Sequence, residues 1–81
     1  MKLLEGKIAV ITGGGRGIGK ATTQQFIQEG ATVVIAEFDE DSGQSTGKEL
    51  GAHFVKTDIS NEESVNALFS FVKSEFGRLD M

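Results

Sequence analysis

The chain has 81 residues, of which 38% are hydrophobic and 25% are charged, and its formal net charge is −4. This length allows one small domain, and the acidic balance argues against the broad basic surface that binds nucleic acid or an anionic membrane. Cysteine is absent, which excludes a disulfide framework and a thiolate metal site. No apolar run approaches the roughly 18 residues of a membrane span, and no secretory signal is recognisable, so a soluble, cytoplasmic protein is expected.

Apolar runs and helical patterns alternate along the chain. Residues 7–11, KIAVI, predict a short buried strand. Residues 17–29 then follow a helical pattern, and Gly30 stands where a C-terminal cap belongs. The apolar face of this helix is expected to contain Ile18, Ala21 and either Phe26 or Ile27.

The middle of the chain repeats the alternation. Residues 32–36, TVVIA, predict a second buried strand. Residues 41–50 predict a weak helix, because Gly43 and Gly47 each cost about 1 kcal/mol relative to alanine. A glycine ends that helix, and residues 53–57, HFVKT, predict a short third strand.

The last predicted helix has the clearest signals. Ser60 and Glu63 have the spacing of a capping box at its start, and Gly77 is expected to cap its end. A single apolar stripe is formed by Val65, Leu68, Phe69, Val72 and Phe76. Residues 78–81, RLDM, look like the onset of a fourth strand. The order β-α-β-α-β-α predicts a parallel sheet with helices on both faces.

The glycine-rich loop after the first strand is typical of a phosphate-binding turn, and two patterns compete for it. The strict dinucleotide pattern GxGxxG does not fit, because Ile18 occupies its sixth place when the count starts at the first motif glycine. Gly14, Gly19 and Lys20 satisfy most of the P-loop pattern GxxxxGK[ST]. However, Ala21 lacks the hydroxyl that would hold Mg²⁺. A P-loop nucleotide hydrolase is therefore an alternative interpretation.

The pattern that fits is TGxxxGxG, and here the sequence resembles the short-chain dehydrogenase/reductase family. The resemblance covers the whole chain, through TGGGRGIG, the acidic residue closing the second strand, TDIS after the third strand, and FGRLDM at the end. It implies an α/β fold with a Rossmann-type doubly wound parallel sheet. Residues 1–81 would be its N-terminal β-α-β-α-β-α portion, a partial NAD(P)-binding domain truncated at the start of the fourth strand.

The resemblance also implies how the loop binds a dinucleotide. Gly13 would allow a sharp turn, Gly17 would let the backbone approach the pyrophosphate, and Gly19 would let the helix pack closely on the sheet. The helix N-terminus supplies free N–H groups for phosphate. The other loop residues expected to contact the cofactor are Gly15, Arg16 and Ile18.

Three residues beyond the loop complete the expected site. Glu37 would accept hydrogen bonds from the adenosine ribose and repel a 2′-phosphate, which favours NAD. Arg16 points the other way, since a basic residue at this place often accompanies NADP in the family, so NADP is the second choice. Asp58 matches the aspartate that takes the adenine amino group, and Ile59 would lie beside the ring.

The family's catalytic serine, tyrosine and lysine, together with an asparagine, lie beyond the fourth strand, and this sequence contains no tyrosine. No catalytic residue and no metal site are therefore predicted here. His53 is interpreted as structural. The acids 39–41 are interpreted as a solvated loop and helix start.

The preferred hypothesis is an NAD(H)-binding fragment of an oxidoreductase that transfers hydride to or from an alcohol or carbonyl substrate. A homo-oligomer is expected for the complete protein, with no nucleic-acid or membrane partner. The 81 residues alone are expected to be inactive and marginally stable, because the first strand would present an apolar edge. The other alternative is a stand-alone adenine-nucleotide-binding module.

Overall fold

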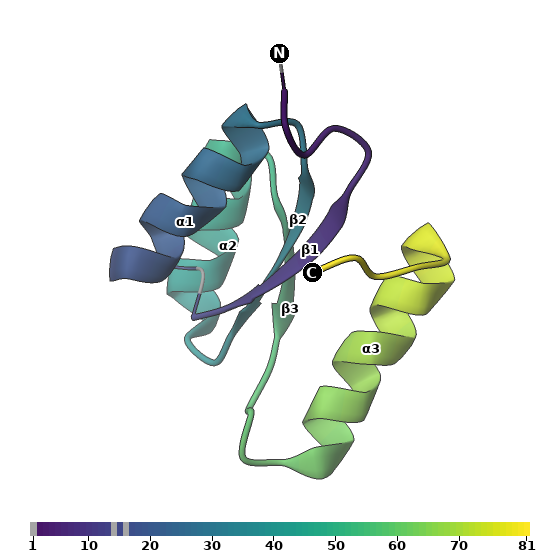
Figure 1. Ribbon diagram of the computed structural model, residues 1–81. Coiled ribbons are helices and arrows are strands. Elements are labelled where there is room, and N and C mark those ends of the chain that lie inside the picture. Colours follow the sequence, from purple (N-terminus) through teal and green to yellow (C-terminus); the bar gives the residue numbers. More distant parts are fainter. Residues whose placement is uncertain (1, 14, 16) are drawn as a thin grey trace.

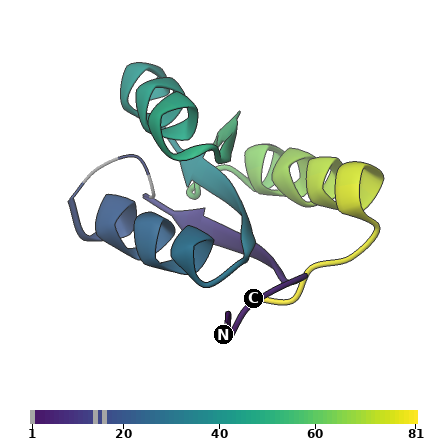
Figure 2. The same ribbon diagram turned by 90° about the horizontal axis from the view of Figure 1, so that it is seen from above.

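The computed structural model describes residues 2–13, 15 and 17–81 and contains one parallel sheet between two layers of helices. The strands are β1 (Ile8–Thr12), β2 (Thr32–Glu37) and β3 (His53–Lys56), and the helices are α1 (Gly17–Gln28), α2 (Glu40–Leu50) and α3 (Glu62–Phe76). Helices α1 and α2 cover one face of the sheet and α3 covers the other (Figure 1). The view from above in Figure 2 shows the same division. The predicted α/β architecture is confirmed.

The strand order is β1-β2-β3, so β2 lies in the centre. Its residues from Val33 to Glu37 are all buried. The prediction that the first strand is buried was wrong in degree, because Ala9 is the one buried residue of β1. Neighbouring strands cover both sides of β2, whereas β1 has only β2 as a regular strand partner among the described residues. Hydrophobicity alone does not reveal which strand takes the centre.

The pleat of β2 divides the core into two clusters, because successive side chains point to opposite faces. Val34 and Ala36 pack against the α3 side, with Leu68 and Val72. On the other face, Val33 and Ile35 lie in a second cluster with residues of α1 and β3, which are Phe26, Ile27 and Phe54. Apolar side chains therefore point to both faces of β2, so helices pack against both faces of the sheet.

The first turn of α1 departs from the predicted apolar face. Phe26 and Ile27 pack in the core as expected, but Ile18 is 87% exposed and Ala21 is exposed as well. Helix α1 starts at the carboxyl edge of the sheet, so its first residues lie at the rim of the molecule. The apolar side chain of Ile18 is thus left available on the surface.

Helix α2 forms in full despite its two glycines. Asp39 caps its start and accepts a hydrogen bond from the Ser42 N–H, and Gly51 ends it in the left-handed conformation. A Cβ atom at Gly43 would overlap the ring of Phe54. The glycine that lowers the helix propensity therefore permits α2 to lie directly against β3.

Helix α3 begins one residue later than the predicted capping box implies. The cap is Asn61, whose side chain accepts from the Ser64 N–H at 3.0 Å. Ser60 instead donates its hydroxyl and its N–H to the carboxylate of Asp58. The Asn61 N–H closes a turn onto the Asp58 carbonyl, and this turn delays the start of the helix. Gly77 caps the end, as predicted.

The predicted stripe on α3 is confirmed for Leu68, Val72 and Phe76 and is wrong for Phe69. Leu68 and Val72 are buried, while Phe69 is exposed. Phe71, which the predicted stripe omits, packs against the core together with Phe76. The apolar spacing along the helix therefore does not by itself distinguish Phe71, which packs against the core, from Phe69, which is exposed.

The residues after α3 return to β1. The Asp80 N–H donates to the Ile8 carbonyl at 2.9 Å, and the Val10 N–H donates to the Met81 carbonyl at 2.7 Å. The Ile8 N–H donates to the Asp80 carboxylate at 2.8 Å. This end of the chain therefore lies beside β1 (Figure 1). Among the described residues, no helix has the length and apolar character to cross a membrane.

Candidate functional site

A hollow of about 320 Å³ opens where the three strands reach their carboxyl ends. It is lined by Thr12, Gly13, Ala36, Glu37, Phe38, Thr57, Asp58 and Ile59. In open parallel α/β sheets, ligands bind at this edge because the loops that leave the strands diverge there. The structure thus brings together four of the residues that the sequence analysis selected, which are Gly13, Glu37, Asp58 and Ile59.

Glu37 is the last residue of β2 and is only 6% exposed. Its Oε2 atom accepts a hydrogen bond from the Asp39 N–H at 3.2 Å. Its Oε1 atom is buried and has no hydrogen-bond partner within the described part of the chain. A buried carboxylate oxygen without a donor is costly, and this atom is free to accept a hydrogen bond from a donor that reaches it.

The glycine loop lies against this carboxylate. A Cβ atom at Gly15 would lie 3.1 Å from both Glu37 Oε1 and the Gly43 nitrogen, closer than ordinary contact. The carbonyl of Gly15 also accepts a hydrogen bond from the Thr46 hydroxyl at 2.6 Å. The loop therefore touches both the end of β2 and helix α2, and a side chain at position 15 would disturb this contact.

The two ends of the loop have the backbone that glycine favours. Gly13 has φ of 67° and Gly17 has φ of 58°, a region that costs other residues energy. Nothing lies within 4 Å of a Cβ built at either position, so the space beside the loop is open. Ile18 and Gly19 follow in the first turn of α1. Arg16, a predicted contact residue, lies outside the described residues.

Asp58 stands at the other side of the hollow, after β3. Ser60 donates to its Oδ1 atom twice, from the hydroxyl at 2.6 Å and from the N–H at 3.0 Å. These hydrogen bonds, of which the hydroxyl bond has the larger effect, lower the pKa of Asp58 below its ordinary value. The carboxylate is ionised at neutral pH and can only accept hydrogen bonds. Ile59 beside it is 70% exposed.

Phe38 was missed by the sequence analysis. It lines the hollow directly after Glu37 and is 63% exposed. The Lys56 Nζ atom lies 5.6 Å from the centre of its ring, a cation–π distance. An aromatic residue immediately after the acidic end of a buried strand is the signal that could have identified it.

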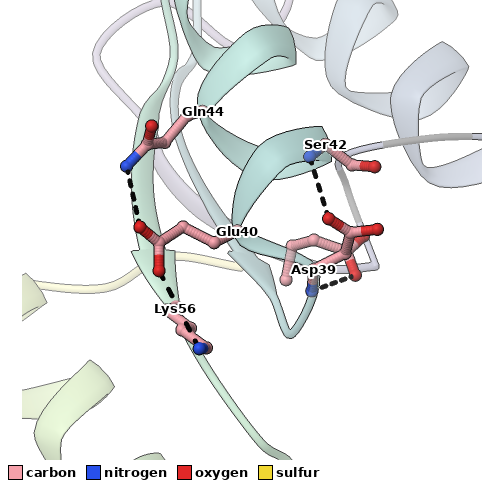
Figure 3. A network of polar contacts seen from close by, with 6 residues as sticks. Asp39, Glu40, Ser42, Gln44 and Lys56 are labelled. Carbon is pink, nitrogen blue, oxygen red and sulfur yellow. Dashed lines mark hydrogen bonds and ion pairs between the residues drawn. The ribbon is translucent and has the colours of Figure 1, made fainter.

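The acids that follow Phe38 form the start of α2. Figure 3 shows Asp39 joined to Ser42, and Glu40 between Gln44 and Lys56. The Glu40–Lys56 ion pair is 3.8 Å long and exposed, so it contributes little stability. The predicted assignment of these acids to a loop and a helix N-terminus is confirmed.

Other candidates have structural partners. The Lys20 Nζ atom lies 3.2 Å from Glu49 on α2, so the lysine of the P-loop alternative faces a carboxylate. His53 packs edge-on against Phe76 at 5.1 Å between ring centres, which supports a structural role. The described residues contain no group of acids and histidine arranged to hold a metal ion.

Comparisons with known proteins agree with this geometry. A family model described as short chain dehydrogenase matches residues 7–81. The chain is 44% identical over 99% of its length to "Tropinone reductase-like 1" of Erythroxylum coca, and covers 30% of that protein. It is 46% identical over 93% of its length to the rabbit (Oryctolagus cuniculus) "L-fucose dehydrogenase", of which it covers 27%.

A solved structure of a 3-ketoacyl-(acyl-carrier-protein) reductase from Brucella melitensis, complexed with NADH, superposes with a TM-score of 0.92 at 40% identity. The match covers 95% of this chain and 33% of that one. The parallel sheet with helices on both faces defines a Rossmann-type α/β class of protein. The chain belongs to the short-chain dehydrogenase family and spans about a third of the length of the relatives it matches.

Proposed function

We propose that this chain is the NAD(H)-binding, N-terminal part of a short-chain dehydrogenase/reductase. The whole protein would transfer hydride between NAD(H) and an alcohol or carbonyl substrate. The observation that carries the proposal is the buried Oε1 atom of Glu37, which lacks a hydrogen-bond donor among the described residues. The relation to a reductase solved with NADH supports the same cofactor class.

The residues present fit the adenosine half of such a cofactor. Glu37 would accept a hydrogen bond from a ribose hydroxyl, which would satisfy its buried oxygen. Asp58 would accept from the adenine amino group, and Ile59 would lie beside the ring. These side chains line one hollow of suitable chemistry.

The glycine loop and the start of α1 fit the pyrophosphate. The free N–H groups at the helix N-terminus and its partial positive charge favour a phosphate there. The open space at Gly13 and Gly17 would let the phosphates approach the backbone, and Gly15, Arg16, Ile18 and Gly19 complete the expected contacts. When bound, the nicotinamide ring of the cofactor gives or takes the hydride.

The preference for NAD over NADP follows from charge. A 2′-phosphate placed on the ribose would come close to the buried Glu37 carboxylate, and like charges repel most strongly where water is excluded. The carboxylate is held in place by the Asp39 N–H. Rotation of the Glu37 side chain away from a 2′-phosphate would break this hydrogen bond.

The experiment compares NADH and NADPH binding to the whole protein by fluorescence titration. Wild type should bind NADH at least about tenfold more tightly, a difference of about 1.4 kcal/mol. Glu37→Gln keeps the shape and removes the charge, so it should bring the two affinities closer together. Glu40→Gln changes an exposed acid three residues away and should leave the preference unchanged.

Equal affinities of wild type for the two cofactors would contradict the NAD assignment. A preference that survives Glu37→Gln unchanged would mean that another group discriminates. Failure to bind either cofactor in a folded protein would contradict the proposed function itself.

A further inference from the structure

Thr46 is a buried polar residue that the cofactor site does not obviously need. It lies in the middle of α2, is 3% exposed, and does not line the hollow. A threonine inside a helix commonly bonds back to the carbonyl four residues earlier. Thr23 of α1 does so, donating to the Gly19 carbonyl at 2.9 Å.

Thr46 makes a bond out of its helix instead. Its hydroxyl donates to the carbonyl of Gly15, 31 positions earlier in the chain, at 2.6 Å. Gly15 is itself buried, so its carbonyl needs a donor from the protein. Thr46 supplies that donor from α2, a helix that follows the loop in the sequence.

The contact lies next to the carboxylate that carries the proposed function. A Cβ atom at Gly15 would lie 3.1 Å from Glu37 and from the backbone nitrogen of Gly43, and Gly43 and Thr46 lie on the same helix, α2. The loop, the end of β2 and helix α2 therefore meet at one point. The hydrogen bond from the Thr46 hydroxyl to the Gly15 carbonyl joins α2 directly to the glycine loop at this point.

We propose that Thr46 is a positioning residue for the pyrophosphate part of the cofactor, acting through the carbonyl of Gly15. This inference rests on the proposed NAD(H) site. Without the Thr46 donor, the Gly15 carbonyl would be left unpaired, and the loop would shift to conformations in which this carbonyl reaches water. Apparent affinity falls in proportion to the fraction of molecules that hold the competent loop.

The position of the loop matters to one part of the ligand only. The pyrophosphate would contact the loop backbone, whereas adenosine would contact Glu37, Asp58 and Ile59. Loss of the Thr46 bond should therefore weaken ligands that contain the pyrophosphate and leave adenosine largely unaffected. A purely structural role would lower stability without separating the two ligands.

The test measures ADP-ribose binding by calorimetry and adenosine binding by NMR titration, using the whole protein. Thr46→Val keeps the shape and removes the donor, so ADP-ribose should bind about tenfold more weakly, while adenosine should change by less than about twofold. Thr46→Ser keeps the donor and should stay near wild type. Thr46→Ala is a second variant without the donor and should behave as Thr46→Val does. Ser45→Ala removes an exposed neighbouring hydroxyl and is the matched control.

Melting temperatures establish that each variant is folded. Unchanged ADP-ribose affinity in Thr46→Val and Thr46→Ala would overturn the inference while the cofactor site stands. An equal loss for adenosine and ADP-ribose, or a loss in Thr46→Ser as large as in Thr46→Val, would overturn it as well. If wild type bound ADP-ribose not at all, both this inference and the proposed function would fall.

Discussion

Glu37 and Asp58 are two carboxylates at the same edge of the sheet with opposite surroundings. Glu37 is buried and keeps one oxygen without a partner among the described residues. Asp58 is half-buried, and Ser60 donates twice to one of its oxygens. The two carboxylates therefore differ in the oxygen that can still accept a hydrogen bond. In Glu37 this oxygen is buried, whereas in Asp58 it is the oxygen that Ser60 does not contact.

Replacing Asp58 by asparagine tests this second requirement. The amide oxygen can still accept from Ser60, so the turn should keep its shape, but the amide nitrogen would then face the adenine amino group, donor against donor. Adenosine and NADH should both bind about tenfold more weakly. Calorimetric titration of wild type and Asp58→Asn measures the change, and the exposed Asp41→Asn is the control. Unchanged affinity in a folded variant would leave Asp58 as a turn residue only.

At the residue scale, the family resemblance selected Glu37, the acid closing the second strand, and Asp58 in TDIS after the third. Both residues line the same hollow, and their roles in cofactor binding stay predictions. Thr46 could not be selected, because its bond spans 31 positions and no short pattern encodes it. Ser60 was mistaken for the helix cap because Ser60 and Asn61 are both good caps, and only the turn closed on Asp58 decides between them.

The elements show why propensity was a poor guide to α2. Its glycines suggested a weak helix, yet the structure uses Gly43 to bring the helix against the Phe54 ring. The order of strands and helices could be predicted because each has its own periodicity. The lesser burial of β1 could not, because it follows from strand order and not from local hydrophobicity.

Gly43→Ala should destabilise the protein, although alanine is the better helix former. The gain in propensity is about 1 kcal/mol, and forcing a methyl group into the Phe54 ring costs about 1–3 kcal/mol. A net loss of about 1 kcal/mol is expected in urea unfolding. Ser45→Ala, an exposed position on the same helix, should be neutral or slightly stabilising. A gain in stability for Gly43→Ala would show that α2 can move away from β3 without cost.

On the scale of the whole molecule, the residues after α3 are tied to the beginning of the chain. The Asp80 carboxylate accepts from the Ile8 N–H, and Arg78 donates to the Gly6 carbonyl at 2.8 Å. The pKa of Asp80 is lowered below its ordinary value, and the hydrogen bond from the Ile8 N–H is the largest cause. The residues after α3 are therefore held beside β1 in part by the ionised carboxylate of Asp80. The predicted marginal stability of the 81 residues alone stays a prediction.

The contribution of the Asp80 carboxylate to the free energy of unfolding should depend on pH. Because the folded-state pKa of Asp80 lies below its unfolded value, its stabilising effect is fully present above about pH 4 and is lost as the pH falls through the folded pKa. Wild type should therefore be more stable than Asp80→Asn at pH 7, and the difference should shrink at about pH 3. Urea unfolding at both values measures this, with Glu75→Gln on the exposed side of α3 as the control. A difference that does not change with pH would show that the charge of Asp80 is not involved.

The contact between Asp80 and β1 can form only after the chain has been synthesised through α3, because Asp80 lies 72 positions after Ile8. β2 pairs with β1 and β3 pairs with β2, so each new strand joins the strand made just before it. The bond from Asp80 to Ile8 instead spans 72 positions and closes a much larger loop. At about 5–20 residues per second, the residues that pair with the outer edge of β1 are synthesised a few seconds after β2. During that interval an emerging chain is most exposed to pairing with a neighbour or to capture by a chaperone.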